Sequence, residues 1–488
     1  MPLDTPAESR AESFGADEYR ARRVAHWEAV ARRQRTPSLF GRSYHHRLEH
    51  VYRFLVPPGL RVLELGCSEG DLLAALEPAE GLGVDFAPAM VEAASRKHPH
   101  LQFVLGDAHD LEQLSGPFDV IVLSDLLHDV WDVQAILARL QRLCHRGSRV
   151  ILNFYSRLWE LPLTGAAKLG LARPVLRQNW LTVSDVENLL YLSDFRAFRV
   201  WQEVLCPLPV PLLAGFCNRV LVKLWGFRHL ALSNFIVARP VAPERAPGRD
   251  LRVSVIVPAR NEAGNVPAIF ARTPEMGSGT ELILVEGHST DDTYAALERA
   301  VVANPHRKAQ LLRQTGRGKG DAVRLGFGAA TGDILMILDA DLTVPPEDLP
   351  RFYEAIRSNK GEFVNGVRLT YPMDDHAMRF ANLVGNKFFS LAFSWLLGQP
   401  IKDTLCGTKV LRREAYQAIA ANRGYFGDFD PFGDFDLLFG AAKMGLEIVE
   451  LPIRYRERTY GTTNIQRWRH GWLLLKMCWF AAGRIKFV

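Results

Sequence analysis

Residues 332–341 read GDILMILDAD and decide the fold of the region around them. The apolar run from Ile334 to Leu338 is short and bounded by turn-forming residues, which is typical of a buried parallel strand. Asp339 and Asp341 follow at its carboxyl end, where open α/β sheets bind their ligands. Two carboxylates one residue apart can share Mg²⁺ or Mn²⁺, since these cations prefer oxygen ligands and take others from substrate phosphates. Taken alone, the pair fits two solvated acids in a turn equally well.

The composition is that of a globular protein with more than one domain. The chain has 488 residues, of which 48% are hydrophobic and 23% charged, and its net charge is +5. This length favours two or three domains, and so mild a charge gives no indication of nucleic-acid binding. The six cysteines are scattered without a Cys-x-x-Cys pair, which favours reduced thiols in a cytoplasmic protein.

Neither a signal peptide nor a membrane span is expected. Residues 8–35 are rich in Arg and Glu and lack the apolar centre of a signal peptide. Within residues 1–40 we expect a mostly exposed helical extension that Trp27 anchors to the body. Elsewhere the chain has no run of the roughly 18–20 apolar residues that a spanning helix requires.

The first half of the chain shows the alternation of an α/β domain. Residues 59–73 read GLRVLELGCSEGDLL, the pattern of a strand, a glycine-rich turn and a helix whose N-terminus offers unpaired N–H groups. Asp85 ends a second strand about twenty residues on, where an acid can bind ribose hydroxyls. Further strands are expected at residues 103–108, 118–124 and 149–153, with helical patterns between them. Such alternation indicates a doubly wound sheet.

These motifs resemble the class I S-adenosylmethionine-dependent methyltransferases, over a domain of residues 41–239. The resemblance implies that S-adenosylmethionine is the cofactor. It also implies the residues that bind the cofactor: Glu64, Gly66, Gly70, Asp85 and Asp107. The sequence departs from the family at Ser68, where a second glycine is usual. The domain is therefore either an active methyltransferase or a degenerate fold that steadies the rest of the chain.

The methyl acceptor is less well marked. Methyl transfer is an in-line displacement that depends on positioning. His128, Asp129 and Asp132 follow the fourth strand and are candidate bases, although solvated loop residues explain them equally well. Residues 153–159 and 178–181 are aromatic and polar, so they either line an acceptor pocket or pack a lid.

Two segments close this half of the chain. Residues 205–227 are apolar, but Arg219, Lys223 and several prolines interrupt them, which favours a buried or surface-lying segment over a membrane span. Residues 240–250 read PVAPERAPGRD, and their three prolines and one glycine indicate an interdomain linker.

The second domain, residues 251–465, repeats the α/β pattern. Residues 253–262 read VSVIVPARNE, residues 281–293 read ELILVEGHSTDDT, and residues 316–324 read GRGKGDAVR. Together with residues 339–341, these strand ends carry acids, an Asn-Glu pair and a basic glycine loop. A nucleoside diphosphate bound through a metal needs such a set, with acids for base, ribose and metal and cations near the phosphates.

This domain resembles the family 2 glycosyltransferases of the GT-A fold, within them most closely the polyprenyl-phosphate (dolichol-phosphate) branch. The resemblance implies that Asp339 and Asp341 bind Mg²⁺ or Mn²⁺. It implies a set of residues that bind the nucleotide-sugar: Pro258, Arg260, Glu262, Glu286, Lys319, Asp321 and Asp339. Glu286 stands where the family usually has Asp, and Gly287-His288 replace a second Asp and Gly. The nucleotide base therefore stays open.

Residues 378–397 form the first acceptor motif. Polar residues from Arg379 to Ser394 recur at near-helical spacing, with apolar residues such as Phe388 and Trp395 on the other side. The segment is either a helix packed on the core or a helix at a membrane interface with its apolar face in lipid. By resemblance, Arg379 is a candidate ligand of a lipid phosphate.

Three further motifs bear on the acceptor. Residues 403–409 read DTLCGTK and resemble the family's acceptor-side motif, while residues 433–438 read GDFDLL where many relatives place a base. The candidate catalytic residues are Asp341, Asp403, Asp434 and Asp436. A sugar hydroxyl needs such a base, whereas a lipid phosphate is already a nucleophile. Arg456 and Arg458, before residues 461–464, resemble the family's phosphate-binding closing loop.

The C-terminal end is basic. From residue 451 onward there are eight Lys or Arg against one acid, a balance that suits an anionic surface. Residues 466–488 are expected to form a basic amphipathic helix. Its apolar part, residues 471–483, is too short to span a bilayer, so it either anchors at the interface or docks on the first domain.

We therefore expect two Rossmann-like α/β domains in tandem and a bifunctional transferase. The second domain would move a sugar, with inversion and a metal, from a nucleotide-sugar to a polyprenyl-phosphate-type lipid. The first would methylate a substrate of the same pathway. The protein would be cytoplasmic and peripheral at the inner face of the cell membrane, with no nucleic-acid partner. The alternative is a soluble or glycan acceptor with a non-catalytic methyltransferase-like domain.

Overall fold

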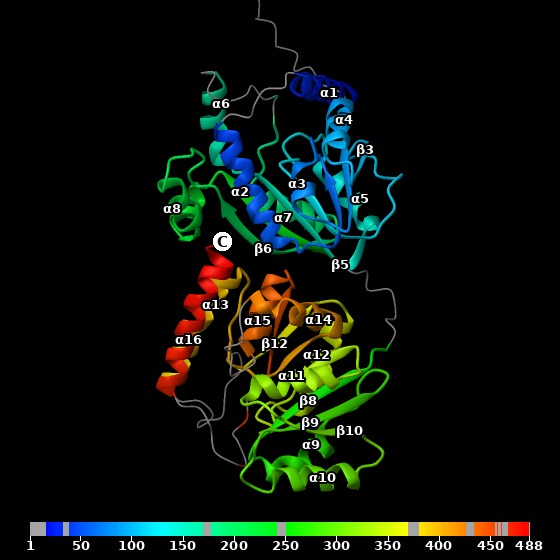
Figure 1. Ribbon diagram of the computed structural model, residues 1–488, viewed down its shortest axis with the longest axis vertical. Helices are drawn as coiled ribbons and strands as arrows, with labels where there is room; N and C mark the ends of the chain where they lie inside the picture. The colour runs from blue at the N-terminus through cyan, green and yellow to red at the C-terminus, as the bar shows by residue number, and fades with distance from the viewer. Residues whose placement is uncertain are drawn as a thin grey trace, which may run out of the picture. The chain divides into compact units, whose positions relative to one another are not determined.

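The structure is a computed structural model that falls into two compact units, Met1–Pro240 and Val241–Val488 (Figure 1). It describes residues 16–32, 39–168, 176, 178–241, 250–368, 380–425, 434–453, 456, 460 and 467–487. Each unit is built on a seven-stranded sheet flanked by helices. The expectation of two α/β domains in tandem is confirmed. Most of the expected linker lies outside the described residues.

The sheet of unit 1 has the order β3-β2-β1-β4-β5-β7-β6. The strands are β1 Arg61–Leu65, β2 Glu80–Asp85, β3 Gln102–Leu105, β4 Phe118–Ser124, β5 Cys144–Tyr155, β6 Phe195–Glu203 and β7 Ser233–Pro240. The helices are α1 Ala16–Arg32, α2 Leu39–Leu55, α3 Asp71–Ala75, α4 Pro88–Lys97, α5 Val133–Leu140, α6 Glu160–Lys168, α7 Val183–Leu192 and α8 Leu213–Arg219. β1 to β5 run parallel, and the strand order reverses between β1 and β4. The carboxyl ends of β1 and β4 are therefore the place where an open α/β sheet of this kind binds its ligands.

Successive side chains of the central strands pack on opposite faces of this sheet. Leu63 and Ile121 belong to one cluster of buried side chains, and their neighbours Val62 and Val120 belong to another. Successive side chains of a strand point to opposite faces. Both faces are thus covered by helices, which explains the nearly continuous apolar runs of these strands.

The apolar segment of residues 205–227 lies on the surface. It contains α8, and Asn218 fixes it through hydrogen bonds of 2.7 Å with both the N–H and the carbonyl of Cys206. Leu212 and Trp225 are 93% and 79% exposed. The surface-lying interpretation is therefore the correct one. Among the residues that the structure describes, none of the helices is long and apolar enough to cross a bilayer.

The sheet of unit 2 has the order β10-β9-β8-β11-β13-β12-β14. The strands are β8 Val253–Ala259, β9 Thr280–Glu286, β10 Lys308–Arg313, β11 Ile334–Ile337, β12 Phe363–Val367, β13 Lys409–Arg412 and β14 Ile448–Pro452. The helices are α9 Val266–Arg272, α10 Thr293–Ala303, α11 Lys319–Ala329, α12 Leu349–Arg357, α13 Phe380–Leu397, α14 Arg413–Ala421, α15 Asp434–Lys443 and α16 Arg467–Ala481. β11 pairs parallel with β8, as expected of a strand in an α/β sheet, and antiparallel with β13.

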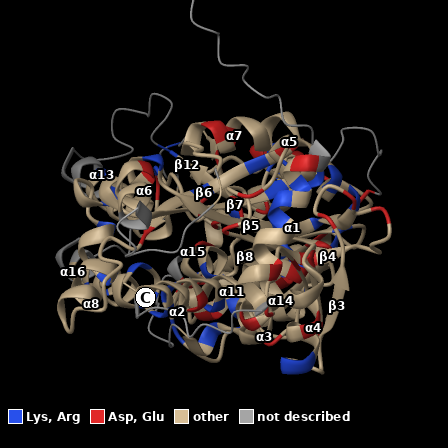
Figure 2. Ribbon diagram, turned by 90° about the horizontal axis from the view of Figure 1, so that it is seen from above, with Lys and Arg blue, Asp and Glu red and all other residues tan. Residues whose placement is uncertain are grey.

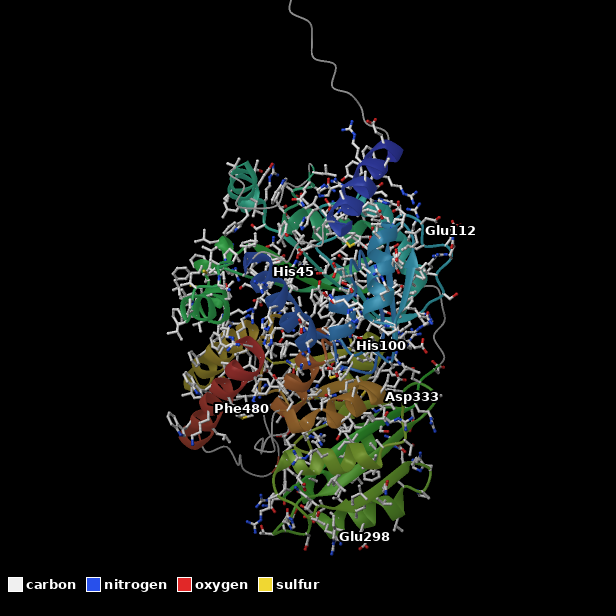
Figure 3. The ribbon with its side chains drawn as sticks, turned by 45° about the horizontal axis from the view of Figure 1, so that its top comes forward. His45, His100, Glu112, Glu298, Asp333 and Phe480 are labelled. Carbon is white, nitrogen blue, oxygen red and sulfur yellow. The ribbon has the colours of Figure 1, made fainter. Side chains whose placement is uncertain are left out.

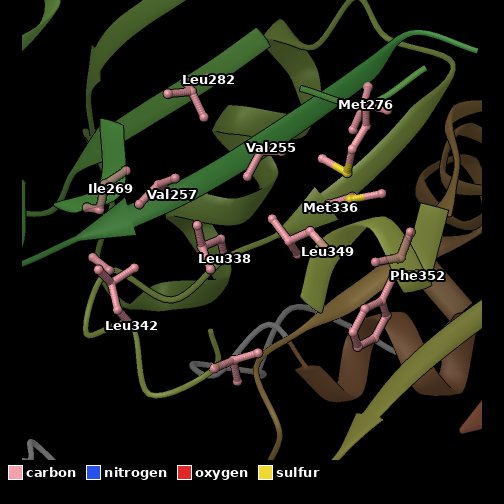
Figure 4. Packing of buried hydrophobic residues seen from close by; sticks show 14 of the residues in the cluster. Val255, Val257, Ile269, Met276, Leu282, Met336, Leu338, Leu342, Leu349 and Phe352 are labelled. Atoms are coloured by element: carbon pink, nitrogen blue, oxygen red, sulfur yellow. The ribbon is translucent and has the colours of Figure 1, made fainter. Parts of the chain in front are cut away.

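The core of unit 2 gathers around β11. Met336 and Leu338 pack with Val255 of β8, Leu282 of β9 and Phe352 of α12 (Figure 4). Because β8, β9 and β11 are parallel neighbours, the loops after all three leave the same edge of the sheet. The chain thereby gathers the polar residues that follow these strands at one edge.

Candidate active sites

The first carboxylate after β11 is already paired with a cation. Lys319, the first residue of α11, places its Nζ 2.6 Å from Asp339 Oδ1. Burial raises the pKa of Asp339, but the positive charges of Lys319, Lys409 and Arg368 outweigh it and leave the pKa below its usual value. Asp339 is therefore ionised at neutral pH, as a metal ligand must be.

The acceptor-side motif touches this pair directly. A Cβ atom built on Gly407 would collide with Asp339 Oδ2 and Lys319 Nζ. Glycine at position 407 thus allows the backbone to lie against the carboxylate and the ammonium group. Residues 403–409 and residues 339–341 form one site, which their separation in sequence did not reveal.

A buried ion pair holds the Gly407 loop in place. Arg368 donates from Nε to Asp403 Oδ2 at 2.7 Å and from its terminal nitrogen to Oδ1 at 2.8 Å. Asp403 also accepts from the backbone N–H groups of Arg368 and Leu405 and has no exposed surface. Buried Lys409 donates to Asn365 Oδ1 at 3.0 Å and to the Cys406 carbonyl. Asp403, expected as a catalytic residue, therefore has the surroundings of a positioning residue.

Asp436 has the same kind of setting. It is 9% exposed, and Arg423 Nε donates to its Oδ2 at 2.8 Å. Asp434 begins α15, but its side chain lies outside the description. Of the candidate catalytic residues, Asp403 and Asp436 are thus both engaged by arginines.

Asp341, the second carboxylate of the pair, is linked through Thr343 to the expected phosphate-binding loop that contains Arg456. Asp341 Oδ1 accepts from Thr343 N–H at 3.2 Å and Oγ1 at 2.9 Å, and the Thr343 carbonyl accepts from Arg456 N–H at 3.0 Å. Arg456 has an exposed side chain beside this turn. Arg379 and Arg458, the other two expected phosphate ligands, lie outside the described residues.

The residues expected to bind the nucleotide lie at the carboxyl ends of β8 and β9 and on α11. Glu262 and Glu286 are buried, and Glu286 Oε1 accepts from Ser289 N–H at 2.6 Å while Glu262 Oε2 accepts from Asn265 Nδ2 at 2.7 Å. Pro258 and Asp321 are half-buried and Arg260 is exposed. The sheet brings all of these residues to the edge that carries Asp339 and Asp341.

His288, one of the two residues at which the sequence departs from the family after Glu286, has a structural role. Its backbone is left-handed, with φ of 58°, and its ring Nε2 lies 2.9 Å from the Gly316 carbonyl oxygen. The loop after β9 is thereby joined to the basic glycine loop that precedes Lys319. This contact connects the nucleotide side of the site to the Lys319–Asp339 pair.

The donor set suits a cation that arrives with its substrate. Within the described part of the chain, no group of three or more His, Cys, Asp or Glu side chains gathers to enclose a metal. Asp339 and Asp341 supply two carboxylates. Mg²⁺ and Mn²⁺ commonly take only one or two protein carboxylates and complete their shells with water and substrate phosphates, so the pair fits such an ion.

In unit 1, the glycine-rich turn after β1 keeps its shape despite the serine. Gly66, Ser68 and Gly70 have φ of 74°, 49° and 76°, so Ser68 adopts the left-handed conformation that glycine favours. Ser68 N–H donates to Asp85 Oδ2 at 2.9 Å, and Ala87 N–H donates to Oδ1 at 3.0 Å. The expected ribose ligand therefore also fixes the turn.

Glu64 is a buried carboxyl group with an unused oxygen. It is 3% exposed, and its Oε2 has no hydrogen-bond partner among the described residues. Burial raises its pKa to about 8, with Asp85 and Asp71 adding to the rise and a hydrogen bond from the Leu73 backbone opposing it. An unsatisfied carboxyl oxygen beside the turn can form a hydrogen bond with a polar ligand, which fits S-adenosylmethionine.

The N-terminal helix α1 forms part of this site. Arg20 Nε lies 2.9 Å from Asp107 Oδ2, and His109 Nδ1 lies 2.8 Å from Oδ1. Trp27 Nε1 donates to Asp129 Oδ2 at 3.2 Å, which confirms Trp27 as an anchor. The helix bears several arginines, drawn blue in Figure 2. The contact of Arg20 with Asp107, which local sequence patterns do not show, places the helix beside an expected cofactor ligand.

The three candidate bases after β4 have other contacts. His128 is 3% exposed and stacks on Tyr155 at 4.4 Å between ring centroids. Asp129 accepts from Trp27, and Asp132 accepts from Ala135 N–H at 3.0 Å as the N-cap of α5. These contacts explain the three residues structurally.

We expect the Gly407→Ala variant to lose metal-dependent nucleotide binding, because the added Cβ must displace Asp339 and Lys319. The measurement is thermal unfolding with UDP, GDP, CDP or dTDP and Mn²⁺, where a bound nucleotide raises the melting temperature of the wild type. Gly328→Ala is the control, since Gly328 lies on the same helix as Lys319 and a Cβ there meets open space. A Gly407→Ala protein with the wild-type shift would contradict the close packing.

The Glu64→Gln variant tests the burial of Glu64. The unfolded chain releases the Glu64 proton near its ordinary pKa of about 4.3, whereas the folded chain holds it to about 8. Wild type should therefore match the variant near pH 4 and lose stability relative to it as the pH rises toward 8, after which the difference should level off. Thermal unfolding across this range measures the difference. Glu69→Gln, an exposed neighbour, should show no such trend, and a pH-independent difference for Glu64→Gln would refute the assignment.

The comparisons with known proteins divide the chain in the same way. The glycosyl transferase family 2 model matches residues 254–420, and a methyltransferase domain model matches residues 62–147. The undecaprenyl-phosphate 4-deoxy-4-formamido-L-arabinose transferase of Klebsiella pneumoniae is 28% identical over 217 residues, which cover 44% of this chain and 62% of that protein. The chain thus spans less than two thirds of the length of that relative.

Two further proteins are similar. The polyprenol monophosphomannose synthase of Mycolicibacterium smegmatis is 28% identical over 221 residues, or 44% of this chain and 81% of that protein. The crystal structure of glucosyl-3-phosphoglycerate synthase from Mycobacterium tuberculosis, with Mn²⁺, uridine diphosphate and product, is 20% identical at a TM-score of 0.36 and covers 48% of this chain and 80% of that one. The family matches show that this chain joins a methyltransferase domain to a family 2 glycosyltransferase domain.

Proposed function

We propose that unit 2 transfers a sugar from a nucleotide-sugar to a polyprenyl-phosphate-type lipid, and that unit 1 methylates a substrate of the same pathway with S-adenosylmethionine. The names of the similar transferases support the lipid acceptor. The observation that carries the proposal is the engagement of Asp403 and Asp436 by buried arginine contacts. A sugar hydroxyl would need a free base there, and a phosphate acceptor does not.

The geometry suggests how unit 2 performs this transfer. The nucleoside diphosphate of the donor lies at the carboxyl ends of β8, β9 and β11. Asp339 and Asp341 would hold a cation, which would neutralise the leaving diphosphate. A phosphate oxygen of the acceptor attacks the anomeric carbon as the bond to the diphosphate breaks, and the configuration inverts. Lys319 stays beside the diphosphate as a second positive charge, and the Gly407 backbone limits the space around both.

The helix α13 presents an unusual pair of faces. The Ser390 and Ser394 hydroxyls donate to the Ile401 carbonyl at 2.6 and 3.0 Å. Phe393 and Leu397 are buried on the same side of the helix, so this side packs on the unit. Phe388 and Leu391 are 55% and 73% exposed on the outside. This arrangement favours the interfacial interpretation of the segment over simple packing on the core, because outward apolar side chains are stabilised by lipid.

The helix α16 extends this outward apolar surface. It packs against α13 (Figure 1), and its Trp472, Leu475 and Trp479 are exposed at spacings of one helical face (Figure 3, where Phe480 marks the helix). Lys387 and Lys476 are exposed beside them. We propose that this surface lies on an anionic membrane, where it meets the lipid acceptor.

The first test of unit 2 is a transfer assay with polyprenyl phosphate, Mn²⁺ and nucleotide-sugars of the base that thermal unfolding selects. We expect Asp341→Ala to abolish transfer, because one cation ligand is lost. Asp436→Asn should keep kcat within about threefold, a small change beside the 10²–10⁴-fold effect of losing a base. A folded Asp436→Asn protein without turnover, or transfer to free sugars alone, would favour the soluble-acceptor alternative.

Membrane binding is tested by flotation with vesicles of phosphatidylglycerol and phosphatidylcholine. The double variant Leu391→Glu/Trp479→Glu should lower the bound fraction about tenfold or more, because two apolar side chains leave the lipid and two negative charges meet it. Val302→Glu is the control, since Val302 is an exposed apolar residue on α10 of the same unit. Equal flotation of wild type and the double variant would remove this surface from the proposal.

A further inference from the structure

Asp125 lies at the carboxyl end of β4 in unit 1. It follows β4 directly and adopts a left-handed backbone with φ of 51°. The next side chain, Leu126, packs against Gly66 of the glycine-rich turn, where a Cβ atom would lie 2.8 Å from Leu126 Cδ1. Asp125 therefore lies beside the turn of β1, at the point where the strand order reverses and ligands bind.

One oxygen of Asp125 is held firmly. Tyr44 Oη donates to Oδ1 at 2.9 Å and Asn153 Nδ2 donates to the same oxygen at 2.6 Å. Tyr52 Oη donates to Asn153 Oδ1 at 2.8 Å and so fixes the orientation of the amide. Burial raises the pKa of Tyr44 well above its usual value, and the Asp125 charge adds to this rise, so the phenol stays a donor.

The other oxygen is available. Oδ2 of Asp125 accepts no hydrogen bond from the residues that the structure describes, and the side chain is 20% exposed. His128 lies 3.7 Å from Oδ1 but is itself buried on Tyr155. Tyr155 and the half-buried Trp180, 6.4 Å apart between ring centroids, add an aromatic wall. A carboxylate with one anchored and one open oxygen has the form of a positioned base.

We propose that Asp125 is the general base for methyl transfer to a hydroxyl group. The inference rests on the proposed function of unit 1 and names its acceptor class. The acceptor oxygen attacks the methyl carbon, the new C–O bond forms as the C–S bond breaks, and the electron pair of that bond stays on sulfur as neutral S-adenosylhomocysteine. The hydroxyl proton passes to Asp125 Oδ2. A phosphate or carboxylate acceptor needs no base and would be repelled by this charge.

The experiment compares wild type with Asp125→Asn, a substitution of nearly equal shape. The affinity for S-adenosylhomocysteine is measured by calorimetry. Methyl transfer is measured as the formation of S-adenosylhomocysteine from S-adenosylmethionine. The acceptors are methyl hexosides as hydroxyl probes, and amino sugars and uronic acids for comparison. We expect turnover of the hydroxyl probes, an unchanged affinity in Asp125→Asn, and a kcat at least about 100-fold lower. The fall of kcat at acidic pH should disappear in Asp125→Asn and persist in Asp125→Glu, which keeps a carboxylate.

Asp132→Asn is the matched control, because Asn caps a helix as well as Asp does, and its kcat should equal that of wild type. Turnover of hydroxyl probes by Asp125→Asn at the wild-type rate would overturn the proposal, as would methylation confined to amino sugars or uronic acids. Equal losses of affinity and kcat in both Asp125 variants would indicate a structural role and would also overturn it. No heat with S-adenosylhomocysteine in wild type is a different failure, which removes methyl transfer itself.

Discussion

The ion pair between Arg368 and Asp403 is the constraint on which the site of unit 2 depends. Asp403 is fully buried, and four N–H donors surround its oxygens, two from the guanidinium and two from the backbone. Breaking such a pair leaves an unpaired buried charge at a cost of about 3–5 kcal/mol. The ion pair therefore holds the loop that follows in place, and the Gly407 backbone of this loop lies against Asp339 and Lys319. Buried charges here fix the geometry of a half-buried ion pair.

The two units use carboxylates in opposite ways. In unit 2, the candidate catalytic acids Asp403 and Asp436 are buried against arginines, and we propose that the acids of the 339–341 turn bind a cation beside a diphosphate. In unit 1, Asp125 has one oxygen fixed by neutral donors and one open. A neutral donor orients a carboxylate without cancelling its charge, so the group can still accept a proton. The same type of sheet edge therefore suits an anionic acceptor in one unit and a hydroxyl acceptor in the other.

The sequence predicted the parts of both sites that depend on local patterns. A short apolar run, a turn and an acid identify a strand end wherever they occur, so Asp85, Glu286, Asp339 and Asp341 were found. The contacts that were missed join distant residues: Arg368 and Asp403 are 35 positions apart, and Tyr44 and Asp125 are 81 apart. Asp125 carries the same signal as Asp85, an acid directly after a strand. The hydrogen-bond partners of Asp125 distinguish it from Asp129 and Asp132, and they are seen only in the three-dimensional structure.

The two sides of α13 show what a helical pattern alone does not predict, which is the side that packs on the protein. Periodicity separates polar from apolar residues, but it does not say which side meets the protein. The backbone of Ile401, which follows the helix, decides this, because its carbonyl and its N–H both form hydrogen bonds with serine hydroxyls of α13. Phe388 and Leu391 are then turned outward, where each Å² of apolar surface left in water forgoes about 25 cal/mol. This exposed apolar surface is the part of the helix that we propose to lie in lipid. The hydrogen bonds of one peptide group thus help to fix which side of the helix is exposed.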